Sequence, residues 1–411
     1  MRRLRPRRRP GSGPPPPPRS PRGGGRSGRR AGSGVERRAP RGRPQPVSRS
    51  RGLNVTRHRN NGVVAGLARD RVGSLLVAAE RRPLVVVLVA AALAVAAALG
   101  LGDVAGFHRV RHELGNIHPQ WLAVCLGGEL LAYVGYVLAI RDTARVDGGP
   151  RLGALASTRS VVAGFGVFAA TRTSGGFAVD YWVLRQAGED RDGAIARVLA
   201  LGALEYAVLA PAALCSAIFL ALSTQEQISD ALTLPWLLVI PGAIAAAWVT
   251  SPRRAARFTE PRQDGRIRRA FAHAVSGLSI LRSLLLASPL EHGLGFLGAA
   301  LYWTGDIACL WGALQVYEGH RLSVPALILG YSTGYVLTRR SLPAGGAGIV
   351  EIALTFALHW VGLPFVPALV GVVTYRLFNF WLPMVPATAV LPAIAELRAE
   401  FAGAEAAADR G

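Results

Sequence analysis

The chain has 411 residues, of which 51% are hydrophobic, and its formal net charge is +22. The positive charge is concentrated at one end: residues 1–82 hold 23 arginines against three acidic residues, and the rest of the chain is close to neutral. An apolar chain with one basic end is typical of a membrane protein with a cytoplasmic tail. Its polar stretches are too short for a separate soluble catalytic domain.

The basic end, residues 1–75, is rich in arginine, proline and glycine and carries too little apolar surface to fold. We predict a disordered cytoplasmic tail there and a short polar tail at residues 398–411. The alternative reading of the arginines is a tether for anionic lipid or nucleic acid. No aromatic residues lie between these arginines, so we expect no nucleic-acid partner.

No segment has a pattern typical of a catalytic, nucleotide-binding or metal site. The chain contains no GxxxxGK[ST] motif and no lysine to complete one. The three cysteines, Cys125, Cys215 and Cys309, are far apart in apolar segments and lack metal-ligand spacing. We therefore expect no enzymatic activity, no metal and no cofactor.

Several apolar runs approach the roughly 20 residues that a membrane-spanning helix needs. The first, residues 83–102, contains no charge. Further candidates are residues 119–140, 195–222, 232–250, 289–317, 322–338 and 364–394. Arginine-rich short loops mark the cytoplasmic side, which places the N-terminus in the cytoplasm. The exclusive use of arginine, with abundant alanine, glycine and proline, indicates a GC-rich genome, so we predict a bacterial cytoplasmic membrane protein with its polytopic domain at residues 76–397.

Two glycine-rich stretches interrupt the apolar runs. The first, TRTSGGFAVD (171–180), lies within residues 152–184, a segment that begins and ends on the cytoplasmic side but is too short for two crossings. We predict a re-entrant hairpin there, because irregular backbone survives at membrane depth only inside protein or beside a watery cavity. The second, TRRSLPAGGAGIVE (338–351), leads into a short helix at residues 348–362.

These features predict an all-α fold: a polytopic integral membrane bundle of about eight membrane segments, with two pseudo-repeats. Each repeat would contain one glycine-broken or re-entrant helix. Transporters place their substrates near the bilayer midplane at such discontinuous helices. The glycine stretches are therefore the first place to look for a site.

Charged residues inside the apolar segments extend this candidate site. A charge at the bilayer centre costs about 2.5–3.5 kcal/mol, so each should face protein or water. Two interpretations stay open: internal ion pairs that fix helix contacts, or a polar track for a lipid headgroup. The candidate substrate-binding residues are Arg172, Asp180, Glu205, Asp306, Arg339, Pro343, Gly345, Gly346, Gly348, Glu351, Tyr375 and Arg376.

The stretches LPAGGAGIVEIAL (342–354) and TYRLFNFWLP (374–383) resemble the signature of the lysylphosphatidylglycerol synthase transmembrane family. The family pattern falls on Leu342, Pro343, Gly345, Gly346, Gly348 and Glu351, followed by Tyr375, Arg376 and Leu377. This family is the flippase-like membrane module of MprF proteins, and the resemblance implies a module without their soluble synthase domain. The resemblance implies a helical module that moves, or helps move, a lipid between leaflets.

Three functions follow as hypotheses. The first is translocation of a phospholipid or lipid-linked headgroup, with membrane lipids as partners. The second is a non-transporting scaffold or accessory subunit, whose partner would be an envelope-synthesis enzyme acting on lipid or glycan. The third, an integral-membrane enzyme acting on a lipid-linked sugar, is the weakest, because no catalytic dyad or metal ligand set is visible.

Overall fold

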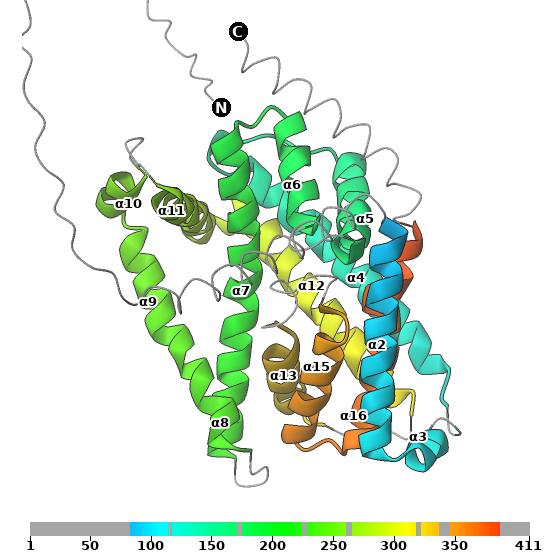
Figure 1. Cartoon of the computed structure of the whole chain (residues 1–411). Helices are drawn as coiled ribbons and strands as arrows, with labels where there is room; N and C mark the ends of the chain where they lie inside the picture. The colour runs from blue at the N-terminus through cyan, green and yellow to red at the C-terminus, as the bar shows by residue number, and fades with distance from the viewer. Residues whose placement is uncertain are drawn as a thin grey trace, which may run out of the picture. The chain divides into compact units, whose positions relative to one another are not determined.

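The computed structural model describes residues 83–113, 115, 117–170, 175–223, 228–259, 265–317, 322–336 and 346–386. Over these residues the chain is helical without a strand, which confirms the predicted all-α membrane bundle (Figure 1). The predicted tails, residues 1–75 and 398–411, lie outside the described residues.

The helices occur in the following order. They are α2 (Pro83–Ala105), α3 (Phe107–Glu113), α4 (Gln120–Arg145), η1 (Val146–Gly148), α5 (Ala154–Ala170), α6 (Gly175–Gln186), α7 (Arg191–Leu222), α8 (Asp230–Thr233), η2 (Leu234–Leu238), α9 (Val239–Val249), α10 (Pro252–Phe258), α11 (Arg266–Leu286), α12 (Pro289–Gln315), α13 (Val324–Tyr331), η3 (Ser332–Val336), α15 (Ile349–Trp360), α16 (Phe365–Arg376) and η5 (Leu377–Trp381). The turns η3 and η5 are π-helical.

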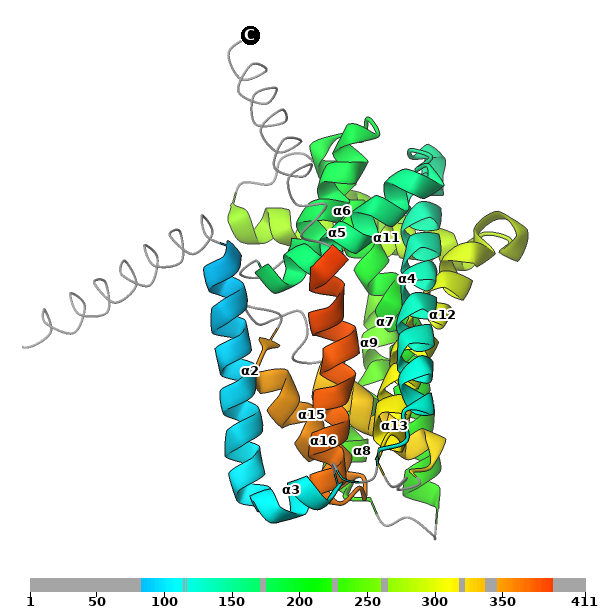
Figure 2. The same cartoon turned by 90° about the vertical axis from the view of Figure 1, so that its right-hand side faces the viewer.

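Among the described residues, five helical segments are long and apolar enough to cross a membrane. They are Gln120–Gly148, Arg191–Leu222, Asp230–Val249, Leu290–Gln315 and Phe365–Pro386. Each overlaps a span expected from the length of an apolar run. The 23-residue helix α2 overlaps the first expected span and packs beside α15 and α16 (Figure 2).

Helices α4 and α12 pack with their backbones in contact. A Cβ atom on Gly128 would lie 2.5 Å from the carbonyl oxygen of Gly305, and one on Gly298 would lie 2.6 Å from that of Gly135. Small residues permit such close approach between membrane helices. Because Gly128 meets Gly305 while Gly135 meets Gly298, the two helices run antiparallel.

The two halves of the bundle repeat with a spacing of 170 residues. The α4 glycines at 128 and 135 have counterparts at 298 and 305 in α12, and the Gly-Gly pair at 175–176 recurs at 345–346. The helices that follow α4 and α12 keep this spacing, since α5 begins at Ala154 and α13 at Val324. With α4 and α12 antiparallel, the halves have the inverted topology found in many transporters.

Each half contains a pair of short helices in place of a full crossing. Helices α5 and α6, of 17 and 12 residues, are each shorter than a crossing and pack on each other, in agreement with the predicted hairpin. In the second half, α13 has eight residues and continues as the five-residue turn η3, which packs against α15. Within the described residues, the segment expected to cross the membrane at 322–338 is thus a short helix that ends in a π-helical turn.

The two short-helix pairs approach from opposite ends of the bundle. The pair α5–α6 follows the C-terminal end of α4, and the pair α13–α15 follows the C-terminal end of α12. Because α4 and α12 are antiparallel, these ends lie at opposite sides, as the positions of α6 and α13 in Figure 1 show. The polar residues described next lie where α12, α13, α15 and α16 meet.

Candidate functional site

Asp306, in the middle of α12, is the centre of a buried hydrogen-bond network. Its side chain is fully buried. One carboxylate oxygen accepts from the Tyr331 hydroxyl at 2.5 Å, and the other accepts from the Tyr375 hydroxyl and the Asn379 amide, both at 2.8 Å. The donors come from α13, α16 and η5, so one acid ties three further elements to α12. Three donors offset the cost of a carboxylate inside a membrane helix.

Glu351 and Arg376 form a second part of this network, at the start of α15. The Arg376 Nε atom lies 2.9 Å from Glu351 Oε1, and both side chains are 3% exposed. The other Glu351 oxygen accepts from the backbone N–H of Gly348 at 2.7 Å, which caps the helix. The guanidinium also lies 4.1 Å from the centre of the Phe380 ring, a cation–π contact.

Glycine is required where the chain enters α15. Gly346 and Gly348 have φ values of 69° and 85°, in the left-handed region that other residues rarely adopt. Both glycines are buried. This backbone turns directly into the helix whose first turn carries Glu351, so the glycine stretch positions the acid that pairs with Arg376.

The two parts of the network are joined through neighbouring residues. Tyr375, which donates to Asp306, precedes Arg376 in α16, and the Arg376 charge acts on Asp306. From α4, the Glu129 side chain also interacts with the Asp306 carboxyl group. The contact between Gly128 and Gly305 explains this, because it places the residues that follow them side by side.

The first half contains a related contact between an acid and a tyrosine. Asp180 of α6 accepts from the Tyr136 hydroxyl of α4 at 2.8 Å and from the Ser160 hydroxyl of α5 at 3.5 Å. In the 170-residue repeat, Tyr136 occupies the position that Asp306 has in the second half. The two halves thus use the same helix position for a buried polar contact, with the roles of acid and tyrosine exchanged.

Glu205 lies in α7 and is also buried, 1% exposed. Its backbone carbonyl oxygen accepts from the Trp303 indole N–H at 2.7 Å, which fixes α7 against α12. Glu205 corresponds to Tyr375 in the repeat. The part of α7 around Glu205 therefore lies against α12, the helix that carries Asp306.

Eight of the twelve expected site residues are described. Asp306, Glu351, Tyr375 and Arg376 belong to one network together with Gly348, and Gly346 lies just before it. Asp180 and Glu205 lie in the first half, each against α4 or α12. The remaining four, Arg172, Arg339, Pro343 and Gly345, lie outside the described residues.

Among the residues of these contacts that sequence reasoning missed are Glu129, Tyr136, Tyr331 and Asn379. Glu129 interrupts an apolar run in CLGGELLAY, so the rule that selected Asp306 also applies to it. Asn379 lies inside the motif TYRLFNFWLP, two residues from Leu377. The tyrosines carry no distinct signal, because a tyrosine in a membrane helix is also common as a packing residue or an interfacial anchor.

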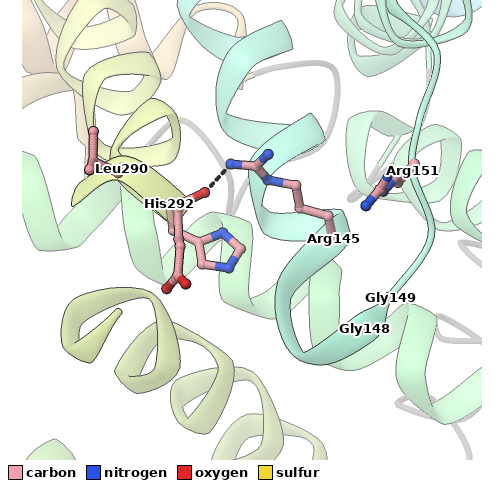
Figure 3. A pocket seen from close by; sticks show the side chains of 7 residues that line it. Arg145, Gly148, Gly149, Arg151, Leu290 and His292 are labelled. Carbon is pink, nitrogen blue, oxygen red and sulfur yellow. Dashed lines mark hydrogen bonds between the residues drawn. The ribbon is translucent and has the colours of Figure 1, made fainter. Parts of the chain in front are cut away.

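A separate pocket of about 480 Å³ lies where α4 ends and α12 begins (Figure 3). Buried Asp142 organises it: its carboxylate accepts from Arg145 Nε at 2.6 Å and from the backbone N–H of Gly295 at 2.5 Å, and lies 3.2 Å from His292 Nδ1. Arg145 also donates to the Glu291 carbonyl oxygen, the dashed line in Figure 3. Asp142, Arg145 and His292 are thus partnered within the pocket wall, and we assign no ligand to this pocket.

Comparison with known proteins identifies the chain at the level of a family. The protein-family model described as the lysylphosphatidylglycerol synthase TM region matches residues 84–387. No curated protein matches the chain. The family match extends from α2 to the end of the described residues and includes both motifs on which the resemblance was based. The chain therefore belongs to the lysylphosphatidylglycerol synthase transmembrane family.

Proposed function

We propose that this protein translocates, or helps to translocate, a lipid between the leaflets of a bacterial cytoplasmic membrane, with its N-terminus in the cytoplasm. The observation that carries the proposal is the buried network of Asp306, Glu351 and Arg376 beside a glycine-opened helix start. Ionisable groups inside membrane segments are costly and mark transport pathways more often than simple packing.

The network offers groups for both charges of a lipid headgroup. Arg376 is a donor for phosphate, and the N-terminal end of α15 carries unpaired N–H groups and a partial positive charge that favour an anion. Asp306 and Glu351 are acceptors for a cationic group. A headgroup would move along these residues while its acyl chains stay in the hydrocarbon.

The inverted repeat supports a reversible opening of this path. Its two short-helix pairs, α5–α6 and α13–α15, approach from opposite ends of the bundle. In transporters with such repeats, the two halves exchange conformations and expose a central site to each side in turn. In this proposal the protein performs no covalent step, and its partners are membrane lipids.

A scaffold for an envelope-synthesis enzyme is the second candidate. The observation that favours it is the internal pairing: Glu351 is bonded to Arg376 and Gly348, and Asp306 has three donors. A network that only fixes helix contacts needs this degree of satisfaction. In that case the network would hold the bundle together and present a constant surface to the enzyme.

A leaflet-asymmetry assay in proteoliposomes separates the two candidates. Fluorescent analogues of phosphatidylethanolamine, phosphatidylglycerol and phosphatidylcholine are placed in both leaflets, and a membrane-impermeant reductant bleaches the outer one. Translocation predicts loss of the protected signal for at least one lipid at a rate well above that of protein-free vesicles. A scaffold predicts protein-free rates for all three lipids.

A further inference from the structure

Helix α10 begins directly after a segment that is long and apolar enough to cross a membrane. That segment, Asp230–Val249, ends with α9, and α10 begins at Pro252. Trp248, in the last turn of α9, is 53% exposed, and the Arg254 guanidinium lies 4.0 Å from the centre of its ring. Tryptophan and arginine at the end of a spanning helix mark the membrane–water interface. Helix α10 therefore lies at that interface.

Helix α11 lies beside α10 at the end of α9 (Figure 1). The rings of Phe258, at the end of α10, and Phe271, in the second turn of α11, are 5.3 Å apart. Further along α11, Arg282 donates to the carbonyl oxygen of Ala247 in the last turn of α9 at 3.3 Å. These two contacts hold α11 at the level where α9 leaves the membrane.

Helices α10 and α11 are strongly basic and contain no acidic residue. Their arginines are Arg253, Arg254, Arg257, Arg266, Arg268, Arg269 and Arg282. Within the part of the chain that the structure describes, none of these arginines forms an ion pair with an acidic side chain. All except Arg254 and Arg282 are exposed. A surface of one charge without internal counter-charges attracts an anionic partner.

An apolar stripe runs along α11 between these arginines. Ile267, Phe271, Ala274 and Leu278 lie on one face, because residues three and four apart are neighbours on a helix. Leu278 packs against the buried core of the bundle, whereas Ile267 and Phe271 are 86% and 46% exposed. Exposed apolar residues flanked by arginines are typical of a helix that lies on a membrane surface.

We propose that α10 and the first two turns of α11 form an interfacial site for anionic phospholipid. The exposed arginines bind the lipid phosphates, and Ile267 and Phe271 enter the boundary between headgroups and acyl chains. The occupant follows from the adjacent end of the spanning segment, from the uncompensated positive charge and from the two exposed apolar side chains. An acidic soluble protein would account for the charge alone. The inference goes beyond the proposed function, because lipid held at this surface is not lipid moved through the bundle.

Fluorescence quenching by brominated lipids tests this site without any measurement of transport. A fluorophore is attached to Ala270→Cys, an exposed position in the second turn of α11, in a background that carries Cys215→Ser. The full-length protein is reconstituted in an equal mixture of phosphatidylserine and phosphatidylcholine, with bromine on the acyl chains of one lipid or the other. The ratio of the two quenching efficiencies reports the local enrichment of the anionic lipid. The control position is Ala231→Cys on α8, exposed at the other end of the same spanning segment.

The site predicts that phosphatidylserine quenches the Ala270→Cys label at least three-fold more strongly than phosphatidylcholine does. The two lipids should quench the Ala231→Cys label equally. Replacement of Arg266, Arg268 and Arg269 together by glutamine should lower the ratio at position 270 to about one. High salt should also lower this ratio, because it screens the attraction between exposed charges.

Two further variants separate the charge from the apolar contact. Replacement of three exposed arginines elsewhere, Arg109, Arg151 and Arg191, by glutamine removes the same charge and should leave the ratio at position 270 unchanged. Replacement of Ile267 and Phe271 together by serine should weaken quenching by both lipids at least two-fold. Melting temperatures show that each variant is folded.

A ratio of about one at position 270, or a raised ratio that survives loss of the three α11 arginines, would overturn the anionic-lipid site. Quenching unaffected by the double serine variant would overturn the apolar contact. A third label, on the exposed Ile244→Cys of α9, reports contact with the bilayer. Quenching there by both lipids, with none at position 270, would place α11 in water and favour an acidic protein partner instead. Because no outcome depends on lipid movement, failure of this site leaves the proposed function intact.

Discussion

The guanidinium of Arg376 and the carboxylate of Glu351 form a buried ion pair, with Nε and Oε1 2.9 Å apart. The two residues are 25 positions apart and lie on α15 and α16. The same carboxylate caps α15 through Gly348. This pair links the glycine-opened helix start to the helix whose Tyr375 donates to Asp306, so the stability of the bundle and the proposed path depend on the same contact.

Arg376→Met should destabilise the fold strongly. Loss of one partner leaves the Glu351 carboxylate buried without its counter-charge, which typically costs about 3–5 kcal/mol. Glu351→Gln should cost less, because the amide still offers an oxygen to the Gly348 N–H. Thermal unfolding in detergent measures both, and Arg254→Met, which removes an arginine on the surface helix α10, is the control. A melting temperature for Arg376→Met equal to that of the control would show that the pair is not needed for stability.

Gly135→Ala should weaken the contact between α4 and α12. The new methyl group would lie 2.5 Å from the Gly298 carbonyl oxygen, so the helices must separate, and overpacking of this kind costs about 1–3 kcal/mol. The control is Gly127→Ala on the same helix, where the methyl group meets nothing within 4 Å. Helix propensity alone should make that control neutral or more stable by about 1 kcal/mol. Membrane abundance and melting temperature compare the two, and equal values would contradict the close backbone contact.

Tyr331→Phe should cost more than Tyr317→Phe. The Tyr331 hydroxyl donates to the Asp306 carboxylate at 2.5 Å, whereas the Tyr317 hydroxyl shares a bond of 2.7 Å with the neutral Thr374 hydroxyl. Hydrogen bonds to charged groups are worth about 1.5–3 kcal/mol and neutral ones about 0.5–1.5 kcal/mol. Chemical denaturation of the two variants in one detergent gives the difference. The reverse order would mean that Asp306 is neutral in the folded protein.

The inverted repeat predicts that the α6–α7 turn and the α15–α16 turn face opposite sides of the membrane. Ala187 and Trp360 are exposed positions near these turns. In a background with the exposed Cys215 replaced by serine, Ala187→Cys should react with a membrane-impermeant maleimide only from the cytoplasm, and Trp360→Cys only from outside. Labelling of both from one side would contradict the inverted arrangement.

The apolar runs predicted the long helices well, since α4, α7, α12 and Phe365–Pro386 overlap spans expected from length and hydrophobicity alone. The interruption at Ser332–Val336 could not be predicted in this way, because a π-helical turn changes the hydrogen-bond pattern without changing composition. The contact between Glu129 and Asp306 depends on how two glycines meet across α4 and α12, which is tertiary information. By contrast, the motif itself selected Glu351 and Arg376 as site residues, and the structure pairs them with each other.

The most direct test of the central claim compares wild-type protein with Glu351→Gln in the leaflet-asymmetry assay, at equal reconstitution and with melting temperatures recorded. If the buried network carries a headgroup, wild-type protein moves phosphatidylethanolamine well above the protein-free rate, and Glu351→Gln is at least ten-fold slower although folded. Wild-type vesicles that move no lipid faster than empty vesicles, or a Glu351→Gln variant as fast as wild type, would contradict the claim.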